Sequence, residues 1–196
     1  MKHTLYAAFA AVILSAFLTG CGSQQQSPAA SEQQSPAASE ESADSLEIGS
    51  ALTIGIPPVT AHAGDKAVPV DVKIWNNPGY NGAGIQILYD AALTPLQGTE
   101  VNEFSDAPAG KCDLGEAAEG FLKSCLIGVE DHMIAFGTMG GEDCTADGTI
   151  FTVYFDIPED APSGHSFTLS CVLDSISNDS KTKLSPVMLD GSITIE

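Results

Sequence analysis

The amino-acid sequence predicts an all-β fold, a sandwich of two packed sheets. Three observations lead to this prediction: apolar residues alternate with polar ones in several short segments, turn-forming residues separate these segments, and helical periodicity is almost absent. Alternation with a period of two puts the apolar side chains of a strand on one face. Many short alternating strands joined by polar turns are typical of sandwiches, in which two such apolar faces meet.

The alternation is clearest in four segments, in which every second residue is apolar: Val68–Trp75, Ile85–Tyr89, Phe151–Ile157 and Phe167–Leu173. Two further strands are expected at Phe121–Gly128 and Met133–Met139. Turn residues such as Asn77-Pro78-Gly79 separate the strands. A helical turn fits only the stretch from Leu114 to Phe121.

The chain is strongly acidic, with a formal net charge of −19 from 26 acidic and 7 basic residues, and it contains no arginine. A surface of this charge repels phosphate backbones and anionic headgroups, so nucleic acid is excluded as a partner. It would attract a basic partner, although acidity also keeps an exported protein soluble. A hydrophobic content of 43% is enough to form a core.

The first 20 residues have the features of a lipoprotein signal peptide. Lys2 gives a short positive start, and the uncharged run from Leu5 to Leu18 is too short to span a bilayer as a helix. The residues Leu18-Thr19-Gly20-Cys21 resemble the bacterial lipobox, in which cleavage leaves an N-terminal cysteine that is acylated. Cys21 is therefore the expected lipidation site, and its lipid would hold the exported domain on a membrane at the cell surface. The alternative is an ordinary signal peptide with a chance cysteine.

Residues 21–47 are expected to form a disordered tether. They are rich in Gln, Ser, Pro, Ala and Glu, and the sequence Gln-Gln-Ser-Pro-Ala-Ala-Ser-Glu occurs at 25–32 and again at 33–40. The segment has no apolar periodicity, so it cannot bury enough surface to become ordered. About 25 residues of coil reach roughly 25–30 Å on average and about 80–90 Å when stretched. The folded domain is expected to follow at residues 48–196.

Four cysteines remain if Cys21 is lipidated: Cys112, Cys125, Cys144 and Cys171. An even number in an exported chain favours two disulfides, for which three connectivities are possible. The preferred connectivity is Cys112–Cys125 with Cys144–Cys171, because the first two cysteines flank a short loop. Such a bridge would add about 3 kcal/mol of stability. A zinc site is the alternative, but no C-x-x-C pair is present and the histidines lack ligand spacing, so no metal is expected.

Several motifs, in their order along the chain, resemble cohesin domains. They are Thr60–Val72, Asn76-Asn-Pro-Gly79, Ala83-Gly-Ile-Gln-Ile-Leu-Tyr-Asp90, Thr94-Pro-Leu96, Asp147–Phe155, Asp160-Ala-Pro-Ser-Gly164 and Asp190-Gly-Ser-Ile-Thr-Ile195. The resemblance covers residues 48–196. Two features depart from it: the segment Lys111–Cys125 holds a cysteine-bearing insert, and Trp75 falls on the polar phase of its strand.

The resemblance implies a jelly-roll sandwich of about nine strands in two sheets. It also implies a non-catalytic module that binds the dockerin domains of polysaccharide-degrading enzymes or scaffold subunits, as in cellulosomes. Together with the lipobox, it predicts a membrane-anchored cohesin that holds dockerin-bearing proteins at the cell surface. No cofactor is expected, and calcium would enter only through a bound dockerin, because the sequence has no calcium-loop motif.

In cohesins the partner lies on one flat sheet face. The alternation of inward and outward residues in the corresponding strands predicts which residues of this chain form that face. Alternation in the strand Met133–Met139 turns Ile134 and Phe136 inward and their neighbours outward. Lys123 is added because a bridge at Cys125 near the rim would turn Lys123 to solvent. The apolar members would form a patch, and the alternative is that they are scattered exposed residues of no special meaning. The expected partner-binding residues are Gly84, Gln86, Leu88, Lys123, Ala135, Gly137, Met139, Thr168, Ser170 and Val172.

Two other functions fit parts of the sequence. Trp75 and Tyr80 would make a sugar-stacking platform if both were exposed, and the chain would then be a carbohydrate-binding surface lipoprotein with polysaccharide as its ligand. A structural envelope domain with a homotypic partner is the third hypothesis. Catalysis is not expected, because the sequence lacks G-x-S-x-G, H-E-x-x-H and any Ser, His and Asp set tied by spacing.

Overall fold

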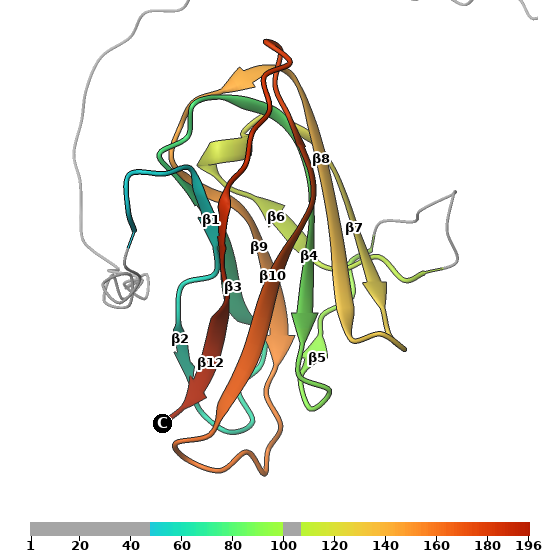
Figure 1. Ribbon diagram of the computed structural model, residues 1–196. Coiled ribbons are helices and arrows are strands. Elements are labelled where there is room, and N and C mark those ends of the chain that lie inside the picture. Colours follow the sequence, from blue (N-terminus) through green and yellow to red (C-terminus); the bar gives the residue numbers. More distant parts are fainter. Residues whose placement is uncertain (1–47, 100–106) are drawn as a thin grey trace, which may run out of the picture. The chain divides into compact units, whose positions relative to one another are not determined.

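The computed structural model describes residues 48–99 and 107–196 (Figure 1). These residues form two six-stranded sheets and one short 3-10 turn, which confirms the predicted all-β sandwich. The predicted signal peptide, Cys21 and the tether lie outside the described residues. Within residues 48–99 and 107–196, no helix is long and apolar enough to cross a bilayer.

The first sheet, called sheet A, is built around two long antiparallel strands, β3 and β9. Its strand order is β11-β1-β3-β9-β5, and β6 pairs with a further part of β9. Strand β1 has a partner on each edge, parallel β11 and antiparallel β3. The strand bounds are β1 Thr53–Gly55, β3 Val68–Trp75, β5 Thr94–Pro95, β6 Cys112–Leu114, β9 Gly148–Asp156 and β11 Val187–Leu189.

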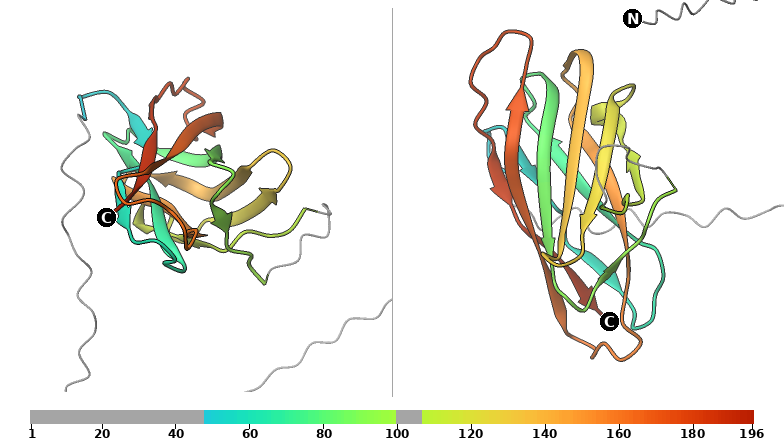
Figure 2. Two further views of the ribbon diagram at one scale, coloured as in Figure 1. Left: turned by 90° about the horizontal axis from the view of Figure 1, so that it is seen from below. Right: turned by 90° about the vertical axis from the view of Figure 1, so that its right-hand side faces the viewer.

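The second sheet, called sheet B, has the order β2-β12-β10-β4-β8-β7. Figure 2 shows its long strands β10, β4, β8 and β7 side by side in the right-hand view. The strand bounds are β2 Val59–Ala61, β4 Tyr80–Tyr89, β7 Leu122–Gly128, β8 Met133–Cys144, β10 Ser166–Ser177 and β12 Gly191–Ile195. The expected number of about nine strands is too low for the described residues, because short strands supplement the edges. One example is the N-terminal segment, which Pro57 and Pro58 divide into β1 and β2, since proline cannot donate to a ladder.

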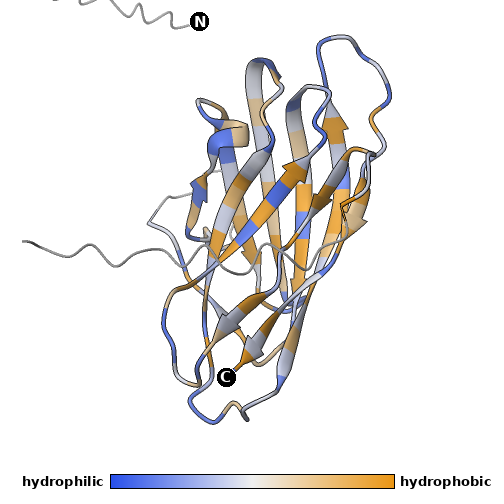
Figure 3. Cartoon of the chain, turned by 90° about the vertical axis from the view of Figure 1, so that its left-hand side faces the viewer, coloured by the Kyte–Doolittle hydropathy of each residue, from blue (hydrophilic) through white to orange (hydrophobic). Residues whose placement is uncertain are grey.

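The core lies between the two sheets and follows the predicted alternation. In β3 the residues Val68, Val70, Val72 and Ile74 are buried, while their neighbours are more exposed. Figure 3 shows hydrophobic and hydrophilic residues alternating along the strands. The rings of Phe136 in sheet B and Phe151 in sheet A stack with centroids 3.7 Å apart and planes inclined by 14°. This stack packs one sheet directly on the other.

The cysteine-bearing insert joins the two sheets. It adds β6 to sheet A, forms the 3-10 turn η2 at Glu116–Ala118, and then enters β7 of sheet B. The turn lies inside the predicted helical stretch. Ala117 is buried and its carbonyl accepts a hydrogen bond of 2.7 Å from the Tyr80 hydroxyl. The Glu116 carboxylate accepts one of 2.9 Å from the Thr149 amide, which lowers the pKa of Glu116.

One of the two disulfides preferred from the sequence is wrong. Cys144 of β8 pairs with Tyr80 of β4, and Cys171 of β10 pairs with Ile87, which lies seven residues further along β4. Seven residues along a strand correspond to about 23 Å, whereas a disulfide needs Cα atoms within about 7 Å. Among residues 48–99 and 107–196 no disulfide is formed.

Cys112 and Cys125 do meet, although they belong to different sheets. Both are buried, and their sulfur atoms share a hydrogen bond. This hydrogen bond and burial raise the pKa of the Cys112 thiol. The Cys112–Cys125 bridge therefore stays a prediction, and its oxidation would tie the insert to β7.

In protein exported through an oxidising compartment, we expect Cys112 and Cys125 to be joined, with two protons released and two electrons passed to a thiol oxidant. Peptide mapping of protein alkylated in denaturant without reduction should recover these two peptides linked, with alkylating reagent on Cys144 and Cys171. The same digest after reduction should carry reagent on all four cysteines and serves as the control. Recovery of Cys112 or Cys125 already alkylated before reduction would contradict the prediction.

Candidate functional site

The outer surface of sheet B, here called the open face, is formed by the outward side chains of β10, β4, β8 and β7. The ladder register aligns these side chains into four rows that cross the four strands. The rows in order are Ser177, Gly82, Met139 and Leu122; then Ser175, Gly84, Gly137 and Ser124; then Val172, Gln86, Ala135 and Leu126; and last Ser170, Leu88, Met133 and Gly128.

The open face gathers most of the exposed large apolar side chains of the described residues. Four of the six lie on it: Leu88 is 41% exposed, Leu122 76%, Met139 65% and Val172 40%. The other two, Val129 and Val187, lie in a turn and on sheet A. Exposed apolar side chains that gather on one face in this way are typical of an interaction site.

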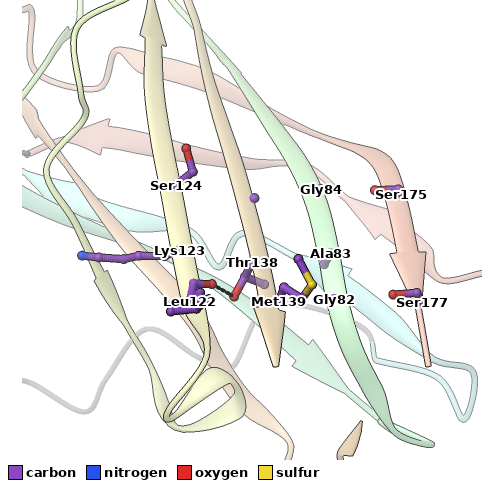
Figure 4. A pocket seen from close by; sticks show the side chains of 11 residues that line it. Gly82, Ala83, Gly84, Leu122, Lys123, Ser124, Thr138, Met139, Ser175 and Ser177 are labelled. Carbon is purple, nitrogen blue, oxygen red and sulfur yellow. Dashed lines mark hydrogen bonds between the residues drawn. The ribbon is translucent and has the colours of Figure 1, made fainter. Parts of the chain in front are cut away.

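A hollow of about 460 Å³ lies within the first two rows. Figure 4 shows Leu122 and Met139 beside it, with Ser175 and Ser177 on the opposite side. Gly84 and Gly137 form its floor, because neither has a side chain to fill the space. The Thr138 hydroxyl donates a hydrogen bond of 2.8 Å to the Leu122 carbonyl, which holds β7 against β8.

Nine of the ten residues expected from the sequence do point outward. Eight of them lie in the rows: Gly84, Gln86, Leu88, Ala135, Gly137, Met139, Ser170 and Val172. Thr168 is exposed but lies opposite Ser192 of β12, outside the four-strand rows. The phase predicted for the Met133–Met139 strand agrees with the burial of Ile134 and Phe136.

The orientation expected for Lys123 is wrong. Lys123 shares the inward side of β7 with buried Cys125, and its ammonium donates a hydrogen bond to the Cys112 carbonyl. Figure 4 shows its side chain extending away from the hollow, which Lys123 borders. Because the insert places the Cys112 carbonyl behind β7, the Lys123 ammonium binds there and does not reach the outer surface of sheet B. The open face therefore lacks the cation expected there.

Sequence reasoning missed several residues of the rows, including Leu122, Ser124, Leu126, Ser175 and Ser177. For β7 a signal existed, because Leu122 and Leu126 share the side opposite Cys125, so a buried cysteine turns both leucines outward. For β10 no such signal existed. A bulge between Leu173 and Ser175 shifts the register and reverses the alternation there.

Charge is confined to the edge of the open face. The four rows contain no charged residue. Asp174 lies in β10 at its bulge, and Asp190 lies directly before β12; their carboxylates border the face near Gly84 and Ser170. Asp190 accepts a hydrogen bond of 2.9 Å from the Cys171 amide, and burial together with this carboxylate raises the pKa of the Cys171 thiol to about 12. In the described part of the chain, no group of three or more His, Cys, Asp or Glu residues is placed to hold a metal ion.

Trp75 and Tyr80 do not form a sugar-stacking platform. Tyr80 is 0% exposed, donates its hydroxyl to Ala117 and packs edge-on against Phe121 with ring centroids 5.6 Å apart. Trp75 ends β3 in sheet A, opposite Thr53. The insert that supplies Ala117 and Phe121 is what buries the tyrosine.

A sandwich whose outer face is hollowed and carries exposed apolar side chains among small and polar ones has the properties of a binding module. The cohesin domain family model matches residues 52–195, and the chain belongs to this family. Cohesin domains are non-catalytic binding modules. A search of curated proteins found no significant match.

Solved structures of cohesins share the fold. The OlpA cohesin of Clostridium thermocellum, solved in a type I cohesin–dockerin complex, has a TM-score of 0.62 and 18% identity over 74% of this chain and 99% of that one. A non-cellulosomal cohesin from the archaeon Archaeoglobus fulgidus has a TM-score of 0.59 and 18% identity over 74% and 91%. A type III cohesin of the ScaE cell-surface anchoring scaffoldin of Ruminococcus flavefaciens has a TM-score of 0.60 and 18% identity over 74% and 88%.

Replacing Lys123 by Met should destabilise the domain, because it removes a donor from the Cys112 carbonyl while keeping most of the hydrocarbon stem. The expected loss is about 1.5 kcal/mol of the free energy of unfolding, measured by urea titration. Lys66→Met is the control, since the Lys66 ammonium is 62% exposed and lies 3.6 Å from Asp156, and such pairs contribute at most about 1 kcal/mol. Equal losses from the two substitutions would show that the inward hydrogen bond of Lys123 contributes no more to the free energy of unfolding than an exposed ion pair does.

Proposed function

We propose that this chain is a non-catalytic cohesin that binds dockerin-bearing proteins, either polysaccharide-degrading enzymes or scaffold subunits, through the open face of sheet B. The observation that carries the proposal is the gathering of Leu88, Leu122, Met139 and Val172 on one face of a cohesin-family domain. Apolar anchors surrounded by small and polar residues are the composition of a protein interface.

The comparisons support a dockerin as the partner class. Two similar cohesins of Clostridium thermocellum, OlpA and OlpC, were solved in complexes with dockerins. The Archaeoglobus cohesin is described as non-cellulosomal, so the proposal does not require a complete cellulosome. The calcium of such a complex would belong to the dockerin, and the cohesin itself would need no cofactor.

A charge placed on the open face should abolish dockerin binding. Val172→Asp buries a carboxylate in the proposed interface, and we expect affinity for a dockerin protein from the same source to fall by about 100-fold or more. Val187→Asp is the matched control, because Val187 is exposed to a similar extent, 48% against 40%, but lies on sheet A. Calorimetry on residues 46–196 gives both affinities.

Three results would contradict the proposal. They are binding that the two substitutions reduce equally, binding that survives removal of calcium by EDTA, and binding of insoluble polysaccharide with no dockerin retained. Light scattering at increasing concentration tests the homotypic alternative in the same samples, since a structural domain of that kind would self-associate without any partner.

The proposal includes membrane attachment through lipid on Cys21. The charged start, the apolar run and the Leu18-Thr19-Gly20-Cys21 sequence support it. The domain would then stand outside the cytoplasm at the end of the 21–47 segment. Two or three acyl chains would hold it far more firmly than a single chain.

Cys21→Ala should separate attachment from binding. We expect the variant to lose its acyl groups and to be released or mislocalised, while its domain binds a dockerin with unchanged affinity, because Cys21 lies outside the cohesin-matched residues. Cell fractionation and mass spectrometry of the N-terminus measure both effects. Retention of the variant in the membrane fraction at the wild-type level would overturn the anchoring proposal.

A further inference from the structure

One side of the sandwich is closed by residues 108–114, here called the seam. The first part of the seam borders β7 of sheet B. There the Gly110 amide donates a hydrogen bond of 3.0 Å to the Cys125 carbonyl, and the Ile127 amide donates one of 2.9 Å to the Pro108 carbonyl. The last part of the seam is β6, which pairs with β9 of sheet A. The seam is therefore bonded to both sheets.

Cys112 and Cys125 lie where the seam passes from β7 to sheet A. Cys112 begins β6 opposite Val153, and Cys125 lies in β7 opposite Phe136. The two cysteines are 4% and 7% exposed, and their sulfur atoms share a hydrogen bond. A Cβ atom on Gly110 would lie 2.7 Å from the Cys125 sulfur, so the seam packs closely on this side chain. A cysteine of sheet A thus contacts a cysteine of sheet B inside the closure.

The seam joins peripheral strands of the two sheets. β7 is the terminal strand of sheet B, and β6 is three residues long. Peripheral segments of this kind open locally at a lower free energy than the central strands of a sheet do. Residues 108–128 contain the seam and β7, and we therefore expect them to open before β4 and β8 separate.

We propose that Cys112 and Cys125 form a redox-dependent lock, a disulfide that keeps the seam closed and β7 attached to sheet A. The lock closes by exchange with a disulfide oxidant. The S–S bond of the oxidant breaks, the bond between the two cysteine sulfurs forms, and the two thiol protons pass to the sulfur atoms of the oxidant. The cysteines are thereby oxidised, and the oxidant is reduced to two thiols. This inference goes beyond partner binding and holds whatever partner the domain has.

Burial determines when the lock can close or open. Exchange requires an attacking thiolate to reach a sulfur atom, and the folded domain covers both cysteines. The seam must therefore open before either reaction can occur. The bond forms while the domain folds in an oxidising compartment, and the closed seam then protects it from reductants.

The lock also restrains one rim of the open face. β7 contributes Leu122, Ser124 and Leu126 to the rows, and Cys125 lies between the last two. A bond at Cys125 therefore restrains the backbone that presents these residues. In the reduced form, opening of the seam would detach β7 from sheet A and leave its ladder with β8 to position them.

Hydrogen exchange measured by mass spectrometry tests the lock in protein purified after export. In reduced protein, peptides from residues 108–128 should exchange faster than those of β4. In oxidised protein, their exchange should be slower by roughly tenfold to 100-fold, because the closed loop limits opening. Cys125→Ala should exchange like reduced protein even under oxidising conditions. The matched control Cys144→Ala should exchange like the oxidised wild type, since Cys144 pairs with Tyr80 outside the seam.

The rate of reduction is the second test. Reductant should break the bond at least about 100-fold more slowly in folded protein than in denaturant, because the seam must open first. Three results would each overturn the lock: equal reduction rates, equal exchange of residues 108–128 in the oxidised and reduced wild type, and no bond between Cys112 and Cys125 after folding with a disulfide oxidant. The wild-type comparisons need no substitution, so the test stands even where Cys125→Ala does not fold.

Discussion

The structure depends on one constraint, the fixed two-residue period of β4. This strand pairs with β10 on one edge and β8 on the other, and it serves two surfaces at once. Ile85 and Ile87 enter the core, while Gly84 and Gln86 reach the open face. A slip of one residue would exchange the two sets and place isoleucines in water. Core packing therefore determines which residues of β4 reach the open face.

The glycines of the open face weaken their strands, and core residues next to them in the chain offset this loss. Glycine weakens a strand, because it loses more backbone freedom on folding and has no side chain to pack. On β8 the weakness of Gly137 is offset by its neighbour Phe136, whose ring stacks on Phe151 across the core. The same strand can thus be hollow on one side and tightly packed on the other. One side of β8 therefore contributes to the core, and the other side borders the hollow of the open face.

The sequence predicted most of the fold because alternation is a local property. The buried side of β3 can be recognised from its own alternation, without reference to any other strand: it carries Val68, Val70, Val72 and Ile74. The same alternation correctly predicted which residues of most strands face outward on sheet B. The errors arose where the answer depended on distant residues. Whether Lys123 points inward depends on the insert behind β7, and whether Cys144 reaches Cys171 depends on the register of β4 with two strands.

Two further features had no local signal at all. The bulge in β10 turns Ser175 and Ser177 outward against the alternation of the preceding residues, and only the pairing with β4 reveals it. Tyr80 is the first residue of β4, next to a turn, a position at which an aromatic side chain is expected to be exposed. The insert buries it, and the Ala117 carbonyl accepts a hydrogen bond from its hydroxyl. In both cases the deciding contact joins segments far apart in the chain, so a single sequence carries no pattern for it.

The pairing of β1 has a mechanical consequence. The described chain enters the domain at Ile48, and its first strand, Thr53–Gly55, is clamped between β3 and β11 by ladders on both edges. The amide of Val187 donates to the Leu52 carbonyl and that of Ile56 to the Leu189 carbonyl, which lengthens the clamp. Tension applied from the N-terminal side is therefore borne as shear by two ladders of sheet A. The open face belongs to the other sheet, so such a load would enter the domain through strands that do not form that face.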